Sequence, residues 1–171
     1  MKKWLAGAVI FTATAICLLF IPYQPALTFT ESRIDQPNVH YLTLTESTDF
    51  QITFTHSIHL TDVVESYRIL PTEDIQLLSM EYSDVAIGMP SYAEEGQTLI
   101  YEDGKYTLTY DEAILPNFTL YIGDVDYDLK LQYMEQTIDL KQQLVRGKSY
   151  FIEVRNVSFY EKIKGVELHG R

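Results

Sequence analysis

The amino-acid sequence predicts an all-β domain, folded as an antiparallel sandwich or a small barrel and preceded by one N-terminal membrane helix. From Tyr41 onward, apolar and polar residues alternate in short runs, and this period of two is typical of strands. The composition agrees, because 13 Tyr and 8 Phe accompany only 4 Met. An uncharged hydrophobic run near the N-terminus predicts the helix.

The expected strands follow one another along the second part of the chain. The alternating runs cover 41–45, 50–55, 105–110, 118–122 and 125–133. Asp103 and Gly104 tolerate the positive φ of a tight hairpin turn, so we expect residues 99–101 to pair with the run that starts at 105. Only residues 135–145 are ambiguous, because their apolar spacing fits both a helix and a strand.

The N-terminal run predicts where the protein is located. Lys2 and Lys3 precede residues 4–21, which as a helix would extend about 27 Å, near the thickness of a bilayer's hydrocarbon core. Basic charge before this run and acidic charge after it predict an extracytoplasmic domain on a single-pass anchor in the cell membrane. Bulky residues stand where signal cleavage needs small ones, which favours an uncleaved anchor; cleavage would give a secreted protein. The expected organisation is a membrane anchor or signal segment (1–22), an extended linker (23–40) and a single β domain (41–171).

Charge and cysteine content exclude several classes of protein. With 13 basic and 24 acidic residues, the chain has a net charge of -11 and repels phosphate backbones, so nucleic acid is not an expected partner. Cys17 is the one cysteine and lies in the hydrophobic run. The folded domain is therefore expected to contain neither a disulfide nor a thiolate site, and we expect no cofactor.

Asp124, Asp126 and Asp128, followed by Glu135, have the carboxylate spacing of a helix–loop–helix calcium site. The sixth position of such a loop needs glycine for a sharp turn, but here it is Leu129. Alternate residues of a strand lie roughly 6.5 to 7 Å apart, too far for three carboxylates to close on one ion. We therefore expect a solvated strand face and no metal site.

Two polar side chains are expected to point toward the core. His56 continues the apolar side of the run that starts at Phe50, and Glu65 lies between apolar residues of the next run. A symmetric loop over residues 59–62 would place His56 opposite Glu65. Directly opposed residues have Cβ atoms about 4.5 to 5.5 Å apart, so the imidazole and the carboxylate could form a hydrogen bond.

Three interpretations of this pair are open. It is a satisfied structural pair, or it forms a binding site with Ser57, Gly88 and Pro90, or His56 and Glu65 serve as acid and base in a hydrolase. The hydrolase interpretation lacks a recognisable nucleophile elbow. His59 faces away from His56 in an extended strand, so a two-histidine metal site would require the turn to fold it back.

Three short motifs resemble those of a known family. They are Phe54-Thr55-His56-Ser57-Ile58, Val63-Val64-Glu65-Ser66-Tyr67 and Ala86-Ile87-Gly88-Met89-Pro90. In this order and spacing they resemble a bacterial family of exported proteins known as domain of unknown function 1850. Where the family tends to have proline this chain has Asp62, and its loop starts with fewer glycines. The resemblance implies association with a tripartite ATP-independent periplasmic (TRAP-type) solute transporter and implies no particular activity.

These observations together favour a non-enzymatic function. We expect a membrane-anchored accessory or binding module, with a TRAP-type transporter component or a small solute as its partner. The alternatives are a structural interaction domain of the cell envelope without a small ligand, and the hydrolase described above.

Overall fold

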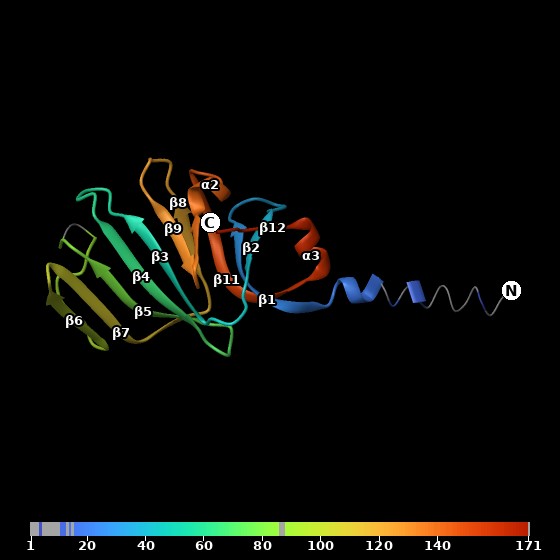
Figure 1. The fold of residues 1–171 in the computed structure, drawn as a ribbon, viewed down its shortest axis with the longest axis horizontal. Coiled ribbons are helices and arrows are strands. Elements are labelled where there is room, and N and C mark those ends of the chain that lie inside the picture. Colours follow the sequence, from blue (N-terminus) through green and yellow to red (C-terminus); the bar gives the residue numbers. More distant parts are fainter. Residues whose placement is uncertain (1–3, 5–10, 13, 15, 86–87, 171) are drawn as a thin grey trace.

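The protein folds into two β-sheets that face one another, as the computed structural model shows for residues 4, 11–12, 14, 16–85 and 88–170 (Figure 1). The five-stranded sheet has the order β12 (Val166–Glu167), β2 (Val39–Thr43), β1 (Pro22–Glu31), β11 (Lys148–Ser158) and β8 (Phe118–Ile122). The seven-stranded sheet has the order β10 (Gln136–Asp139), β9 (Leu129–Tyr133), β3 (Asp49–Thr55), β4 (Asp62–Ile69), β5 (Ile75–Tyr82), β7 (Lys105–Leu115) and β6 (Gln97–Glu102). Two short helices, α2 (Leu140–Gln143) and α3 (Phe159–Lys164), lie before and after β11.

The prediction of an all-β domain is confirmed. Paired strands are antiparallel except β12 and β2, which are parallel. The two sheets are separate and neither closes on itself, so the described residues form the expected sandwich and not the small barrel. Asp103 and Gly104, with φ of 49° and 78°, form the predicted two-residue turn between β6 and β7.

The expected extended linker over residues 23–40 is wrong. Residues 22–31 form β1, which pairs with β2 on one side and with β11 on the other. Ala26, Leu27, Thr28 and Phe29 are fully buried there. As a central strand, this segment buries apolar side chains that a linker would leave in solvent. The Thr28 hydroxyl is buried with them and donates a hydrogen bond to the Glu153 carbonyl.

Two further segments differ from expectation. Residues 125–128 lie in the loop after β8, so only the second part of the expected 125–133 strand forms, as β9. The ambiguous residues 135–145 contain both states, a strand (β10) followed by α2. The strand ends and the helix begins at Asp139, because its carboxylate accepts hydrogen bonds from the backbone N–H groups of Lys141 and Gln142 and so caps the helix.

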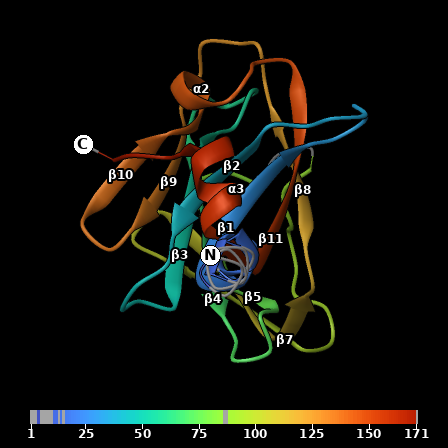
Figure 2. The same cartoon turned by 90° about the vertical axis from the view of Figure 1, so that its right-hand side faces the viewer.

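Residues 16–21 lead away from the two sheets and leave the domain beside α3 (Figures 1 and 2). Residues 11–12, 14 and 16–19 are helical. Among the described residues, no helix meets the length and hydropathy needed to cross a membrane. Much of the expected span over residues 4–21, namely 5–10, 13 and 15, lies outside the residues that the structure describes.

The main core lies between the sheets. Leu27, Phe29 and Ile152 contribute to it from the five-stranded sheet, and Ile52 and Leu131 from the seven-stranded sheet; all five are essentially inaccessible to solvent. A second, smaller cluster forms on β4, β5 and β7 from Val63, Tyr82 and Leu108, with Met89 of the β5–β6 loop packed against it. The five-stranded sheet thus covers only part of its partner, and a loop covers another part.

Candidate ligand groove between the two sheets

The hairpin that joins β3 to β4 sets the register of the predicted site. Its loop is residues 57–60: the His56 N–H donates to the Thr61 carbonyl at 2.8 Å, and the Leu60 N–H donates to the His56 carbonyl at 2.9 Å. Leu60 has a positive φ of 55°, which closes this four-residue turn. The loop therefore comes two residues earlier than the expected loop over residues 59–62.

The earlier loop changes which residues are opposed but not which face they occupy. A strand displaced by an even number of residues keeps every side chain on its original face. Ile52 lies opposite Glu65, and Phe54 lies opposite Val63. The predicted His56–Glu65 pair is therefore wrong, and with it the acid–base geometry of the hydrolase alternative. The inward direction of Glu65 is right, because its side chain is half-buried and reaches the groove described below.

His56 has a different set of neighbours at the start of the loop. Its Nδ1 atom is buried without a hydrogen-bond partner, and its ring centroid lies 6.0 Å from that of His59. The turn thus folds His59 back toward His56, contrary to the expectation for an extended strand. His59 Nδ1 in turn lies 3.8 Å from Asp84 Oδ2. Within the described part of the chain, no three His, Cys, Asp or Glu side chains are arranged to hold a metal ion.

Glu65 pairs instead with Tyr67, which is two residues further along β4 and therefore on the same face. The Tyr67 hydroxyl donates to Glu65 Oε2 at 2.7 Å. The Tyr67 ring is held between two others, with its centroid 5.0 Å from Phe50 and 5.3 Å from Phe118, both nearly parallel to it. This stacking fixes the hydroxyl in position, so the carboxylate has a donor that cannot easily turn away.

Burial controls the protonation of both groups. It raises the pKa of the Glu65 carboxyl, although the hydrogen bond from Tyr67 partly opposes this change. Burial also raises the pKa of the Tyr67 phenol, and the adjacent Glu65 raises it further. Tyr67 therefore remains a neutral donor at all ordinary pH values, whereas Glu65 holds its proton more readily than an exposed glutamate does.

A groove of about 440 Å³ lies where β8 of the five-stranded sheet faces β3 and β4 of the other. Its walls are mainly apolar and include Phe54, Phe118, Leu120 and Leu129. Ser57 and Glu65 are among the few polar groups that line it. Lys141 also lines the groove, and its ammonium donates to the Val125 carbonyl at 2.6 Å. Apolar walls with a few polar groups are typical of sites for small organic ligands.

Only part of the predicted set of site residues lines the groove. Ser57 and Glu65 line it, but Gly88 and Pro90 line a second hollow, of about 420 Å³, beside Tyr110. The Tyr82 hydroxyl donates to the Pro90 carbonyl at 2.6 Å and holds that loop on the sheet. Burial raises the pKa of Tyr110 in this second hollow, and the negative charge of Glu65 raises it further.

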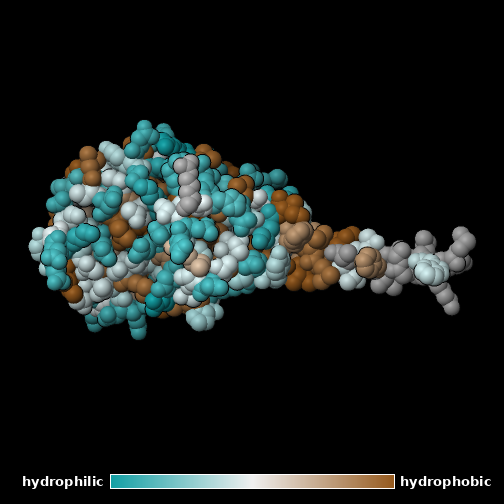
Figure 3. All heavy atoms as spheres, viewed as in Figure 1, coloured by the Kyte–Doolittle hydropathy of each residue, from teal (hydrophilic) through white to brown (hydrophobic). Residues whose placement is uncertain are grey.

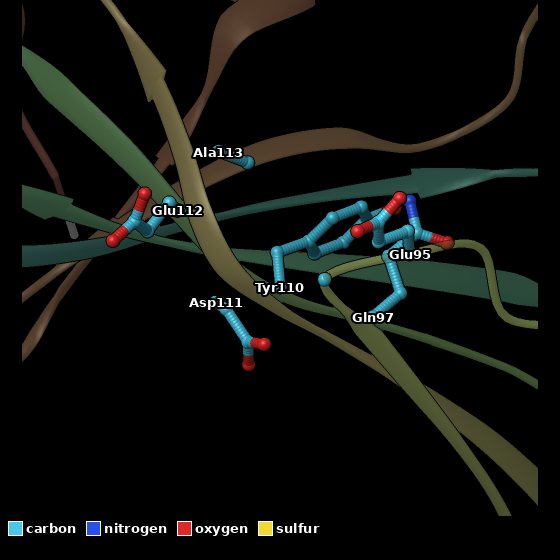
Figure 4. Close-up of a pocket in the computed structure, with 7 residues that line it drawn as sticks. Glu95, Gln97, Tyr110, Asp111, Glu112 and Ala113 are labelled. Carbon is cyan, nitrogen blue, oxygen red and sulfur yellow. The ribbon is translucent and has the colours of Figure 1, made fainter.

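A third hollow lies along β6 and β7 and is acidic (Figure 4). Glu95, Asp111 and Glu112 line it with Tyr110 and Gln97. In Figure 4 the carboxylates of Asp111 and Glu112 point away from each other and from Glu95. Their oxygens do not converge on a common point, so we assign no cation site here.

Two of the three aspartates with calcium-like spacing are paired with basic side chains. Asp126 Oδ1 accepts from Arg146 at 2.6 Å, and Asp128 Oδ2 accepts from Lys130 at 2.6 Å. The Arg146 guanidinium lowers the pKa of the Asp126 carboxyl, chiefly through this hydrogen bond. These carboxylates lie on an exposed loop and not on the solvated strand face that was expected.

Tyr67, Phe118 and Lys141 are groove residues that the sequence interpretation missed. Tyr67 could have been found, because a residue two positions from an inward carboxylate shares its face. Phe118 and Lys141 carry no such signal. They reach the groove only because β8 belongs to the other sheet and α2 follows β9 and β10.

The fold and the groove define a two-sheet β domain with an amphipathic hollow at the edge of its sandwich. Residues 50–140 match the family described as domain of unknown function (DUF1850), and the chain belongs to that family. The match includes β8 and the seven strands of the larger sheet, apart from Asp49 at the start of β3, and contains every groove residue except Lys141. Comparisons with curated proteins and with solved structures give no match.

Proposed function

We propose that this protein is an extracytoplasmic, membrane-anchored binding module whose ligand site is the groove between β8 and the β3–β4 hairpin. The observation that carries the proposal is the inward carboxyl of Glu65, held by Tyr67 at 2.7 Å within apolar walls. A carboxyl carried into such surroundings is costly for folding alone, and a ligand that contacts it would offset the cost.

The chemistry of the groove favours one class of ligand. Tyr67 occupies one carboxylate oxygen, and a carboxylate can accept further hydrogen bonds. Phe54, Phe118 and Leu120 provide apolar contact beside it. The expected ligand is a small molecule with an apolar body and a hydrogen-bond donor, an amine or a hydroxyl, as its head group.

Three probes that share one ring and differ in head group test this proposal: benzylamine, benzyl alcohol and benzoate. The full chain in detergent micelles should show a saturable rise in melting temperature with benzylamine and a smaller one with benzyl alcohol, because a ligand that binds the folded state raises its stability. Benzoate should give none, because the Glu65 carboxylate repels it. In Glu65→Gln the amine should lose its advantage over the alcohol.

Two matched variants control for nonspecific binding and for partition of the probes into detergent. Val125 lines the groove and Ile100 lies on β6, away from it, and their exposed fractions are 55% and 52%. Val125→Arg should abolish the response to benzylamine, and Ile100→Arg should leave it unchanged. Equal responses in both variants, or no saturable response to any probe, would contradict the proposal and favour the structural envelope domain.

The transporter association rests on the family resemblance, and family membership is what supports it. We propose that the anchored domain works beside a TRAP-type transporter. Covalent crosslinking in its own cells, followed by purification of the tagged full chain, should enrich the membrane subunits of such a transporter. Their absence from the crosslinked material would contradict this part of the proposal and leave the groove proposal standing.

A further inference from the structure

Helix α3 leaves large apolar side chains in solvent at the end of the domain next to the N-terminal segment. Phe159, Ile163 and the following Val166 are exposed to 47%, 67% and 47%, and no residue of α3 is fully buried. Yet α3 is firmly built, because Ser158 and Glu161 form a reciprocal capping box at its start. A rigid helix that presents its apolar side chains outward marks an interaction surface.

This surface is continuous with the N-terminal segment. The ring of Phe20 packs on Tyr160 with centroids 4.7 Å apart, and the neighbouring Ile21 and Tyr23 are also exposed. Figure 3 shows hydrophobic atoms gathered where the domain meets this segment, and Figure 2 shows α3 beside its exit. We call the six exposed side chains of Phe20, Ile21, Tyr23, Phe159, Tyr160 and Ile163 the stem patch.

The charges around the stem patch differ from those of the whole chain. The chain has a net charge of -11, but α3 carries Lys162 and Lys164. Its one acidic residue, Glu161, is paired with Arg155 at 2.7 Å. The Lys164 ammonium lies 5.4 Å from the centroid of the Tyr160 ring, so basic and aromatic groups lie together. Aromatic, aliphatic and lysine side chains in this combination suit the interface of a bilayer, where rings lie at headgroup level and ammonium groups meet phosphates.

We propose that the stem patch rests in the headgroup layer of the bilayer that anchors residues 4–21. The inference rests on the anchoring part of the proposed function and adds a second, interfacial contact to it. That contact holds α3 against the lipid surface and directs β6, at the other end of the domain, away from it (Figure 1). The β domain thereby has a fixed orientation to the bilayer, which a flexible tether alone would not give.

A fluorophore on a single engineered cysteine tests the contact in the full chain, reconstituted alone in nanodiscs of phosphatidylcholine and phosphatidylglycerol. Cys17→Ser removes the native thiol, and Ile163→Cys or, as the matched control, Ile100→Cys carries the label. Lipids with a spin label on the headgroup should quench the position-163 label severalfold more than the position-100 label. Replacing Lys162 and Lys164 by Gln should reduce this difference in anionic nanodiscs.

Trp4, the one tryptophan of the chain, separates failure of the contact from failure of the anchor. Lipids brominated in the acyl chain should quench Trp4 if the N-terminal segment enters the bilayer. Quenched Trp4 with equal quenching at positions 163 and 100 would overturn the interfacial contact and leave the anchor standing. Equal quenching would instead favour a protein, such as a transporter subunit, as the occupant of the stem patch. Unquenched Trp4 would overturn the anchor and the proposed contact together.

Discussion

Removing the Tyr67 hydroxyl should destabilise the folded domain by an amount that depends on pH. Tyr67→Phe keeps the ring between Phe50 and Phe118 and deletes only the group that donates to Glu65. A hydrogen bond to a charged partner contributes about 1.5 to 3 kcal/mol, and one to a neutral partner about 0.5 to 1.5 kcal/mol. The loss in the free energy of unfolding should therefore move from the lower of these ranges toward the upper one as the pH rises from 4 to 8 and Glu65 gives up its proton.

The sign follows from the pKa of Glu65. Because burial raises this pKa above the unfolded value, the folded state binds the proton more tightly, and the group favours folding at low pH. That contribution is lost as the pH rises through the raised pKa. Tyr67→Phe removes the one cause that lowers this pKa, so the variant should lose more stability than the parent protein over the same rise in pH.

Urea unfolding of the full chain in detergent, followed by near-ultraviolet circular dichroism, measures the effect. The signal comes from the 13 tyrosines, since the one tryptophan, Trp4, precedes the β domain. Tyr82→Phe is a matched control, because its hydroxyl donates to the neutral Pro90 carbonyl at 2.6 Å and its loss should not depend on pH. An equal loss at pH 4 and pH 8 for Tyr67→Phe would refute the reasoning about Glu65.

Three more predictions follow from single features of the fold. Gly104→Val should lower the free energy of unfolding by about 1 kcal/mol or more, because Gly104 has a φ of 78° in the β6–β7 turn; urea unfolding measures this loss. Ser158→Ala should lower the free energy of unfolding by about 1 kcal/mol because the α3 cap is lost, whereas Ser158→Thr should keep the cap and most of this stability in the same assay. Burial lowers the pKa of His40, so the unfolded chain takes up its proton first and stability should fall as the pH drops below 6.5. His40→Phe, which keeps an aromatic ring against Tyr150, should show a smaller fall between pH 7 and pH 5 in thermal melts.

Local pattern was enough to predict much of the larger sheet. Antiparallel strands with one buried face alternate in polarity, and β3 and β7 of that sheet follow this rule, as does β8 of the smaller sheet. The β6–β7 turn was predictable because Asp103 and Gly104 adopt positive φ without help from the rest of the fold. The strand β1 also has alternating Leu27 and Phe29, but its prolines suggested a linker. Only the presence of β2 and β11 on its two sides decides that this segment is buried.

For the site, the sequence by itself determined that Glu65 points inward, because alternation along a strand fixes the face of each side chain and survives any even shift of register. The tertiary structure decided what Glu65 meets. The left-handed conformation of Leu60 starts the return strand two residues early, which separates Glu65 from His56 and leaves it with Tyr67. The opposite wall of the groove comes from β8 in the other sheet, and no local pattern encodes a contact that depends on how two sheets pack.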